Sequence, residues 1–242
     1  MDLDIAPLNG RLELLGELGG FWPVFMTKDP TAAFYYRHFD TLWPEFTLLA
    51  LDRESGRPVA YAHSVPLSFS GDISAGLPEG GWDWAVRSAV HDRLTGTPPT
   101  IVSALEIMIR PDLRGGGLSG RMLTAMRENA ARHGFTDLVA PVRPSGQFSE
   151  TIDGYAWEAR EDGLPVDPWL RVHVRAGGRI VNVAHCSMTI AGTLSQWREW
   201  TGLPFSASGQ VEVPGALASV RCDVEQDYAV YVEPNVWVHH QL

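Results

Sequence analysis

Three consecutive glycines, Gly115 to Gly117, stand between a predicted strand and a predicted helix, and they constrain the fold more than any other feature. The strand covers residues 101–109 (IVSALEIMI), and the helix covers residues 118–133 (LSGRMLTAMRENAARH). Glycine tolerates a positive φ and lets the backbone approach a ligand closely. The first amides of a helix have no partner within it, and they lie at the positive end of the helix dipole. The turn is therefore a candidate anion site, most naturally for phosphate.

The segments around this turn predict a mixed α/β domain. Residues 136–142 (TDLVAPV) form the next strand, so residues 101–142 make a strand–helix–strand unit, which places its two strands parallel. Residues 46–52 and 58–67 are two predicted strands around a polar turn, which is typical of an antiparallel hairpin.

Further elements are expected on both sides of this core. Helices are predicted over residues 11–19 and from Pro30, with Asp29 as the N-cap, through the aromatic-rich segment that ends at Phe46. Additional helices are expected at 81–96, 149–160, 168–176 and 195–202, and additional strands at 179–190, 218–223 and 228–238. We expect a single domain over residues 1–242, with its core motif at 101–145, an insertion at 70–100, and an extension at 146–242 that completes the sheet.

Two well-known phosphate-binding loops fit the turn poorly. The dinucleotide fingerprint G-x-G-x-x-G is matched by Gly115, Gly117 and Gly120, but about five residues separate the strand from the turn. The acidic residue of that fingerprint should end the next strand, whereas Asp137 begins it. The P-loop requires a Lys followed by Ser or Thr, which the turn lacks. A turn without a ligand is a further interpretation, although adjacent glycines carry an entropy cost.

The turn resembles the pyrophosphate-binding signature of the GNAT (Gcn5-related N-acetyltransferase) superfamily, Arg/Gln-x-x-Gly-x-Gly/Ala. It reads Arg114-x-x-Gly117-x-Ser119, and the preceding strand ends in an Arg-Pro-Asp turn (110–112) that is similar to the family. The resemblance covers residues 101–145, roughly a fifth of the chain. It implies an α/β (α+β) fold whose mixed, mostly antiparallel central sheet has one splayed parallel strand pair and flanking helices.

The resemblance also implies a site for acetyl-CoA as co-substrate. The pantetheine arm would pair with the main chain at Met108, Ile109 and Arg110. The pyrophosphate would bind the turn and the start of the helix, with Arg114 and Arg143 as charged contacts. The residues implied at the turn itself are Gly115, Gly116, Gly117, Leu118, Ser119 and Gly120. The reaction implied is direct attack of an acceptor amine on the thioester.

Three side chains are candidates for proton transfer. Glu106 is the first candidate base, because a carboxylate in an otherwise apolar strand needs a partner or a task; the alternative is a pairing with an arginine. His63, on the preceding strand, is a second candidate base because its ordinary pKa suits proton transfer; the alternative is a half-buried histidine with no catalytic role. Tyr155 is implied by the resemblance as the acid for the leaving thiolate, or else packs in the core.

Aromatic residues allow two interpretations as well. Helical spacing favours core packing, whereas the early helices of the resembling family often line the acceptor cleft. The residues concerned are Phe34, Tyr35, Tyr36, Phe39 and Trp43. Trp82 and Trp84, in the 70–97 insertion, predict either a lid over the acceptor or a surface loop.

Composition limits the partners. Lys and Arg number 19 against 29 Asp and Glu, so the net charge of −10 argues against nucleic acid and anionic membranes. Cys186 and Cys222 are expected to be two buried free thiols. His239 and His240 have no third ligand at useful spacing, so no metal is expected. The N-terminus lacks a secretory pattern and no apolar stretch is long enough for a membrane span, which predicts a cytoplasmic protein.

We therefore expect an acetyl-CoA-dependent N-acyltransferase that acts on the amine of a small molecule, and the resemblance to GNAT proteins suggests a homodimer. The sequence is also compatible with a longer acyl-CoA, a hydroxyl acceptor, a non-catalytic CoA-sensing module, and an interaction domain without a nucleotide ligand.

Overall fold

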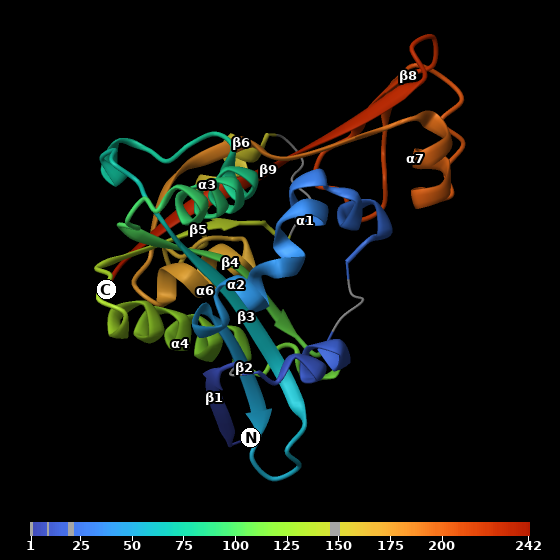
Figure 1. The fold of residues 1–242 in the computed structure, drawn as a ribbon. Helices are drawn as coiled ribbons and strands as arrows, with labels where there is room; N and C mark the ends of the chain where they lie inside the picture. Colours follow the sequence, from blue (N-terminus) through green and yellow to red (C-terminus); the bar gives the residue numbers. More distant parts are fainter. Residues whose placement is uncertain (1, 9, 19–21, 146–150) are drawn as a thin grey trace.

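The computed structural model describes residues 2–8, 10–18, 22–145 and 151–242, which form one nine-stranded sheet with helices on both faces (Figure 1). The strand order is β1-β2-β3-β4-β5-β9-β8-β7, and β6 pairs with β9. The strands are β1 (Leu3–Pro7), β2 (Thr47–Asp52), β3 (Pro58–Leu67), β4 (Ile101–Ile109), β5 (Asp137–Val142), β6 (Arg179–Gly192), β7 (Gly209–Val211), β8 (Val220–Asp223) and β9 (Tyr228–Gln241). Only β4 and β5 are parallel among these pairings, so the predicted mixed, mostly antiparallel sheet is confirmed.

The parallel strands β4 and β5 part toward their C-terminal ends. Their pairing is limited to Val102 with Leu138 and Ser103 with Val139, although both strands continue beyond these residues. On its opposite edge β4 pairs with β3 along nearly its whole length. The second half of β4 therefore has main-chain groups that face an opening rather than a neighbouring strand of the described sheet.

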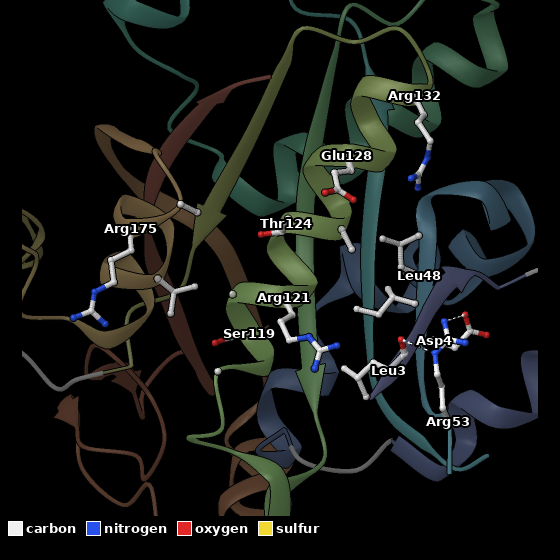
Figure 2. Close-up of a pocket in the computed structure, with 16 residues that line it drawn as sticks. Leu3, Asp4, Leu48, Arg53, Ser119, Arg121, Thr124, Glu128, Arg132 and Arg175 are labelled. Atoms are coloured by element: carbon white, nitrogen blue, oxygen red, sulfur yellow. Dashed lines mark hydrogen bonds and ion pairs between the residues drawn. The ribbon is translucent and has the colours of Figure 1, made fainter. Parts of the chain in front are cut away.

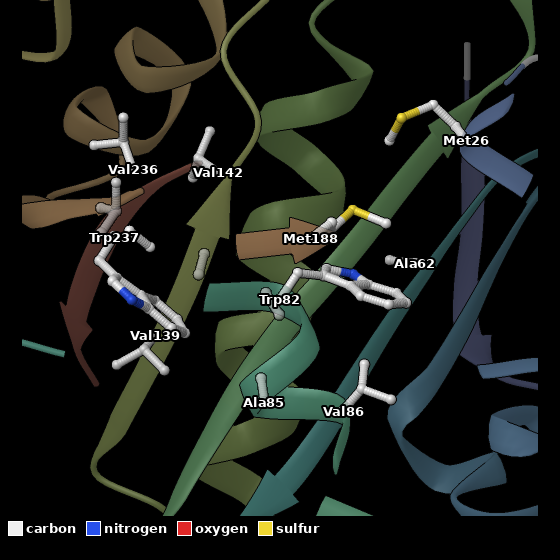
Figure 3. Close-up of a cluster of buried hydrophobic side chains, with 14 of the residues drawn as sticks. Met26, Ala62, Trp82, Ala85, Val86, Val139, Val142, Met188, Val236 and Trp237 are labelled. Atoms are coloured by element: carbon white, nitrogen blue, oxygen red, sulfur yellow. The ribbon is translucent and has the colours of Figure 1, made fainter. Parts of the chain in front are cut away.

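Helices α3 (Gly81–Thr95) and α4 (Leu118–Arg132) cover opposite faces of the sheet; Figure 3 shows α3 in front of β4 and α4 behind it. α4 follows the glycine turn and buries Met122, Met126 and Ala130, the stripe that the sequence predicts. The shorter helices are α1 (Pro30–Phe34), α2 (Phe39–Leu42), α5 (Ile152–Trp157), α6 (Pro168–Arg175) and α7 (Leu194–Thr201). The 3-10 helices are η1 (Leu12–Leu18), η2 (Val24–Lys28), η3 (Tyr36–His38), η4 (Pro44–Phe46), η5 (Ile73–Ala75) and η6 (Pro111–Leu113).

Two buried tryptophans help to fix α3 on its face. Trp82 lies near Met188, Ala62 and Val86 in Figure 3, and its indole N–H donates to the Leu105 carbonyl at 3.2 Å. Trp237 donates to the Pro78 carbonyl at 2.8 Å. Because both indole N–H groups have partners, the rings are buried without an unsatisfied donor.

The C-terminal part of the chain joins the same sheet. β9 pairs with β5 through residues 236–241, with β8 through residues 228–230, and with β6 over much of its length. In Figure 1, β8 and α7 project from the body of the protein at the end opposite α4.

The aromatic segment after Pro30 differs from its prediction. Asp29 accepts a bond from the Ala32 amide and Pro30 begins α1, as expected. The helix ends at Phe34, however, and the segment continues as η3, α2 and η4 rather than as one helix. Tyr35 (φ −121°) and Trp43 (φ −138°) depart from helical geometry, so the chain bends at both residues.

Three further expectations need correction. The sequence does not predict strands β1 and β7, because a five-residue and a three-residue edge strand carry little periodicity. The 11–19 helix takes 3-10 geometry. Cys222 is buried, but Cys186 is exposed, so the prediction of two buried thiols is wrong for Cys186. Its strand changes register between Ala184 and Met188, which leaves this stretch outside the paired residues.

Candidate active site

The glycine turn has the geometry that its sequence predicts. Gly115 and Gly117 adopt φ values of +83° and +76°, a region that favours glycine. Gly117 is the N-cap of α4 and provides no side-chain bond to the helix amides. A Cβ built on Gly115, Gly117 or Gly120 would meet nothing within 4 Å. The turn therefore presents the backbone of a helix N-terminus to open space, which suits the close approach of an anion.

An open cavity of about 780 Å³ begins at this turn and follows the outer side of α4 (Figure 2). Gly117, Ser119 and Gly120 line one end. Arginine side chains from α4 and α6 also line the cavity, namely Arg121, Arg132 and Arg175. Arg121 lies in the first turn of α4, beside the helix N-terminus, which favours an anionic ligand at that end, whereas Arg132 ends the helix and Glu128 also lines the cavity.

The residues predicted to hold the pantetheine arm lie at the end of β4. Met108 and Ile109 are buried and pair with Tyr61 and Ala60 of β3. Their strand has no β5 partner beyond Ser103 among the described residues, so the side of β4 toward the opening is available. Arg110 donates to Asp112 at 2.7 Å, which fixes its side chain beside the turn.

Glu106 is surrounded by three aromatic hydrogen-bond donors. The Trp22 indole donates to Oε1 at 2.7 Å, and the Tyr61 hydroxyl donates to Oε2 at 3.3 Å. The Tyr36 hydroxyl also donates to Oε2. None of the described arginines pairs with this carboxylate, so the alternative of an arginine partner is wrong. We call Glu106, Trp22, Tyr36 and Tyr61 the Glu106 cluster.

Burial and hydrogen bonding shift the pKa of Glu106 in opposite directions. Burial raises the pKa of Glu106 above its ordinary value, although bonds from Tyr36, Trp22 and Tyr61 favour the ionised form. Burial and the nearby Glu106 charge raise the pKa of Tyr36 and Tyr61, so both phenols keep their protons. A carboxylate with a raised pKa beside an opening in the sheet is suited to accept a proton.

His63 lies opposite Glu106 across the β3–β4 pair. It is buried, its Nδ1 lies 3.1 Å from the Thr47 hydroxyl, and its ring contacts Tyr36 and Tyr61 edge-on. Burial lowers the pKa of His63 to about 4, so the ring is neutral near pH 7. This environment favours Glu106 over His63 as the base.

The predicted aromatic set divides between core and surface. Phe39 and Trp43 are buried, Tyr36 joins the Glu106 cluster, and Phe34 and Tyr35 are exposed. The Trp82 ring lies 5.3 Å from the Tyr36 ring, so α3 of the insertion packs beside the Glu106 cluster.

The two remaining site predictions fall after β5. The Tyr155 hydroxyl donates to Asp167 at 3.2 Å, and burial followed by the Asp167 charge raises the pKa of Tyr155 to about 12. Arg143 donates to the buried Glu233 at 2.9 Å and lies over the Trp22 ring. These contacts do not test the predicted roles of Tyr155 as an acid and of Arg143 as a phosphate contact, so both stay predictions.

Sequence reasoning missed Trp22 and Glu233. Trp22 stands in a stretch with no local pattern to mark it, and Glu233 lies in a strand whose buried neighbours are mostly apolar. An acidic residue within the buried part of β9 is the one signal that the sequence holds, by the same argument that identifies Glu106.

The histidines singled out in the sequence have partners within the protein. His239 lies 2.6 Å from Asp137, and His240 lies 2.9 Å from His173. Across the described ranges, no group of three or more His, Cys, Asp or Glu side chains is arranged to hold a metal ion. The helices of these ranges are also too short or too polar for a membrane span.

Comparison with known proteins decides the family. The chain is 31% identical to "Arginine N-acetyltransferase avaD" of Aspergillus versicolor over 254 aligned positions, which cover 93% of this chain and 87% of that protein. The chain belongs to the GNAT superfamily. As a GNAT protein it is an acyltransferase with acetyl-CoA as co-substrate, which favours an enzyme over a sensing module or an interaction domain.

Solved structures agree on the GNAT fold. The loading GNATL domain of CurA from Lyngbya majuscula has a TM-score of 0.55 at 16% identity, covering 99% of this chain and 96% of that one. The GphF GNAT-like decarboxylase, in complex with isobutyryl-CoA, has a TM-score of 0.54 at 17% identity, covering 100% and 99%. No family model matches the chain.

Proposed function

We propose that this GNAT protein transfers the acetyl group of acetyl-CoA to a nitrogen of arginine or of a closely similar guanidine-bearing small molecule. The acceptor class follows the relative named above, an arginine N-acetyltransferase. The observation that carries the proposal is the half-buried Glu106 carboxylate beside the β4–β5 opening. A cationic acceptor needs a negative group there, and the attacking nitrogen needs a base.

The glycine turn is the proposed site for the pyrophosphate of acetyl-CoA. The turn fits this group because Gly115, Gly117 and Gly120 leave free the space that a side chain would occupy. The amides at the start of α4 would donate to the phosphate oxygens, with Arg114 beside them. The free edge of β4 from Glu106 to Arg110 would pair with the amides of the pantetheine arm.

On the opposite face, Glu106 is the proposed base. It would take a proton from the acceptor nitrogen as the nitrogen attacks the thioester carbon, forming the C–N bond. The C–S bond then breaks, and the leaving thiolate receives a proton. Tyr155 is our candidate acid for that proton, which it would recover from solvent. Burial of Glu106 supports the base role, because the raised pKa brings the carboxyl closer to the pH at which proton transfer is efficient.

The proposal is tested by direct assay. Purified protein is incubated with acetyl-CoA and L-arginine, thiol release is followed over time, and mass spectrometry identifies the product and the modified nitrogen. We expect thiol release that depends on arginine and a product heavier by one acetyl group. Thiol release without acetylarginine, or no release above the rate without enzyme, would contradict the proposal.

We further propose a cytoplasmic enzyme without nucleic-acid or membrane partners, and a homodimer in solution. The net charge of −10 supports the first part, because phosphate-rich surfaces would repel the protein. Light scattering after size exclusion tests the dimer, and a mass of 26.6 kDa would contradict it.

A further inference from the structure

A basic side chain lies next to the Glu106 cluster. Arg143 directly follows β5, at the end where β5 has parted from β4. Its guanidinium carbon lies 5.8 Å from the centre of the Trp22 ring, and the same indole donates to Glu106 at 2.7 Å. Trp22 thus connects a carboxylate on β4 with a guanidinium at the end of β5, across the opening between these strands.

The guanidinium of Arg143 is oriented from one side. Its Nε donates to Glu233 at 2.9 Å, and its Nη2 donates to the Gly215 carbonyl at 2.6 Å. Glu233 is 1% exposed and also accepts from the Tyr231 hydroxyl at 2.8 Å, whereas the Arg143 side chain is 25% exposed. None of the described residues accepts a bond from Nη1. The edge of the guanidinium that carries Nε and Nη2 is therefore fixed, and the N–H groups of Nη1 are left for a ligand.

The partners of Arg143 come from segments that pack tightly together. Gly215 has a φ of +85°, and a Cβ there would lie 2.9 Å from Cγ of Pro23, the residue next to Trp22. The backbone at Gly215 therefore lies close to Pro23, which places the Gly215 carbonyl beside the Trp22 segment. Glu233 and the Gly215 carbonyl therefore hold the Arg143 guanidinium from one side, while the Arg143 side chain stays partly exposed.

Arg143 lies on the acceptor face rather than at the phosphate turn. Its contact with Trp22 links it to Glu106 and Tyr36, and the Tyr36 ring contacts Trp82 of α3. The glycine turn instead begins α4, which covers the opposite face (Figure 3). A negative group and a positive group with an indole between them match an amino acid, which carries a cationic nitrogen, an apolar stem and a carboxylate.

We propose that Arg143 binds the carboxylate of the acceptor, and that the enzyme thereby selects an amino acid over the amine that lacks this group. The inference rests on the proposed function and specifies its substrate class. It differs from the prediction that Arg143 contacts the cofactor phosphates, and the two roles have different kinetic signatures.

The test compares L-arginine with agmatine, which is arginine without its carboxylate, as acceptors for the wild type and for Arg143→Gln. We expect kcat/KM for arginine to fall about 30-fold in the variant, since a charged hydrogen-bond pair is lost. We expect kcat/KM for agmatine and KM for acetyl-CoA to change less than about 3-fold. Arg160→Gln, which alters an exposed arginine paired with Asp162, serves as the matched control and should leave both acceptors unaffected.

Two results for Arg143→Gln would overturn the inference. An equal fall for both acceptors in Arg143→Gln, repeated in Arg143→Gln/Glu233→Gln to remove the unpaired buried carboxylate, would mean a structural role. A rise in KM for acetyl-CoA alone would mean a phosphate contact. Two further pairs, lysine with cadaverine and tyrosine with tyramine, each compare an amino acid with the amine that lacks its carboxylate. They separate a failure of the proposed acceptor, arginine, from a failure of the proposed carboxylate contact. If one of these pairs is acetylated in place of arginine, the proposed acceptor is wrong, and carboxylate selection is measured on that pair. If no acceptor is acetylated, both proposals fail.

Discussion

The glycine turn before α4 and the Glu106 cluster on the opposite face differ in what they present to a ligand. The turn presents backbone from a few adjacent residues, and the Cβ positions of Gly115, Gly117 and Gly120 have open space around them. The cluster presents side chains that are far apart in the sequence, since Trp22 and Tyr36 lie 84 and 70 residues from Glu106. A backbone site depends on conformation, whereas a side-chain site depends on packing, so different substitutions should damage each one.

The largest effect is expected at the side-chain site. Glu106→Gln keeps the shape of the side chain but removes the proton acceptor, so kcat should fall about 10²- to 10³-fold. The dissociation constant for acetyl-CoA, measured by calorimetry, should stay within about 3-fold of the wild type. Glu161→Gln, at an exposed glutamate, is the control. A Glu106→Gln enzyme with a rate near that of the wild type would remove the base role.

The pH dependence sharpens this prediction. Glu106 acts as a base only when ionised, so the wild-type kcat should fall as the pH drops through its pKa, which burial places above the ordinary value of 4.5. The residual rate of Glu106→Gln should not fall over this pH range. A fall at the same pH in both proteins would assign the titration to another group.

The next effect is expected at the backbone site. Gly117→Val places a β-branched residue at φ +76°, which distorts the turn, so KM for acetyl-CoA should rise about 10- to 100-fold, by about 1–3 kcal/mol. At saturating acetyl-CoA, KM for arginine should change little. Gly163 has the same φ of +76° and equally open surroundings, so Gly163→Val is a matched control for backbone strain. Equal effects of both substitutions would show that strain alone explains the loss.

A substitution at Gly120 should have a smaller effect, and it should change the stability of the fold and the affinity for CoA in opposite directions. Gly120 lies inside α4 with open space at its Cβ position, so Gly120→Ala should stabilise the fold by about 0.5–1 kcal/mol through helix propensity. If phosphate approaches this backbone, the added methyl group should weaken CoA binding about 3- to 10-fold. Thermal melts with and without CoA measure both quantities. A variant that is more stable and binds CoA as well as the wild type would place the phosphates elsewhere.

The last prediction concerns a buried, neutral histidine of the α3 face, and its readout is how stability depends on pH. Because burial lowers the pKa of His63 from 6.5 to about 4, His63 contributes stability above pH 6.5 that is lost as the pH falls toward 4. His63→Asn should therefore destabilise the protein by about 1–2 kcal/mol at pH 7 and by less at about pH 4.5. Urea unfolding at both pH values gives the difference. A penalty that is constant with pH would show that His63 does not titrate in this range.

The same contrast explains what the sequence could predict. The glycine turn, the β4–α4–β5 unit and the hairpin of β2 and β3 are encoded by local pattern, and all are present in the structure. Glu106 could be singled out because its charge interrupts an apolar strand. Its partners could not, because Trp22 and Tyr36 reach it only after η2, α1 and η3 have packed on the sheet. The aromatic segment after Pro30 has helical spacing, but the backbone leaves helical geometry at Tyr35 and Trp43, which divides the segment into short helices.

The central claim is that backbone on the α4 face holds the cofactor and side chains on the α3 face hold the acceptor. Amide hydrogen exchange tests it most directly, with CoA and arginine added separately and together. CoA alone should protect the amides of Gly115 to Arg121 and the second half of β4, and leave α1, η3 and the Gly215 turn unchanged. These segments should gain protection once arginine is added. Protection of the α3 face by CoA alone, with the glycine turn unaffected, would contradict the account.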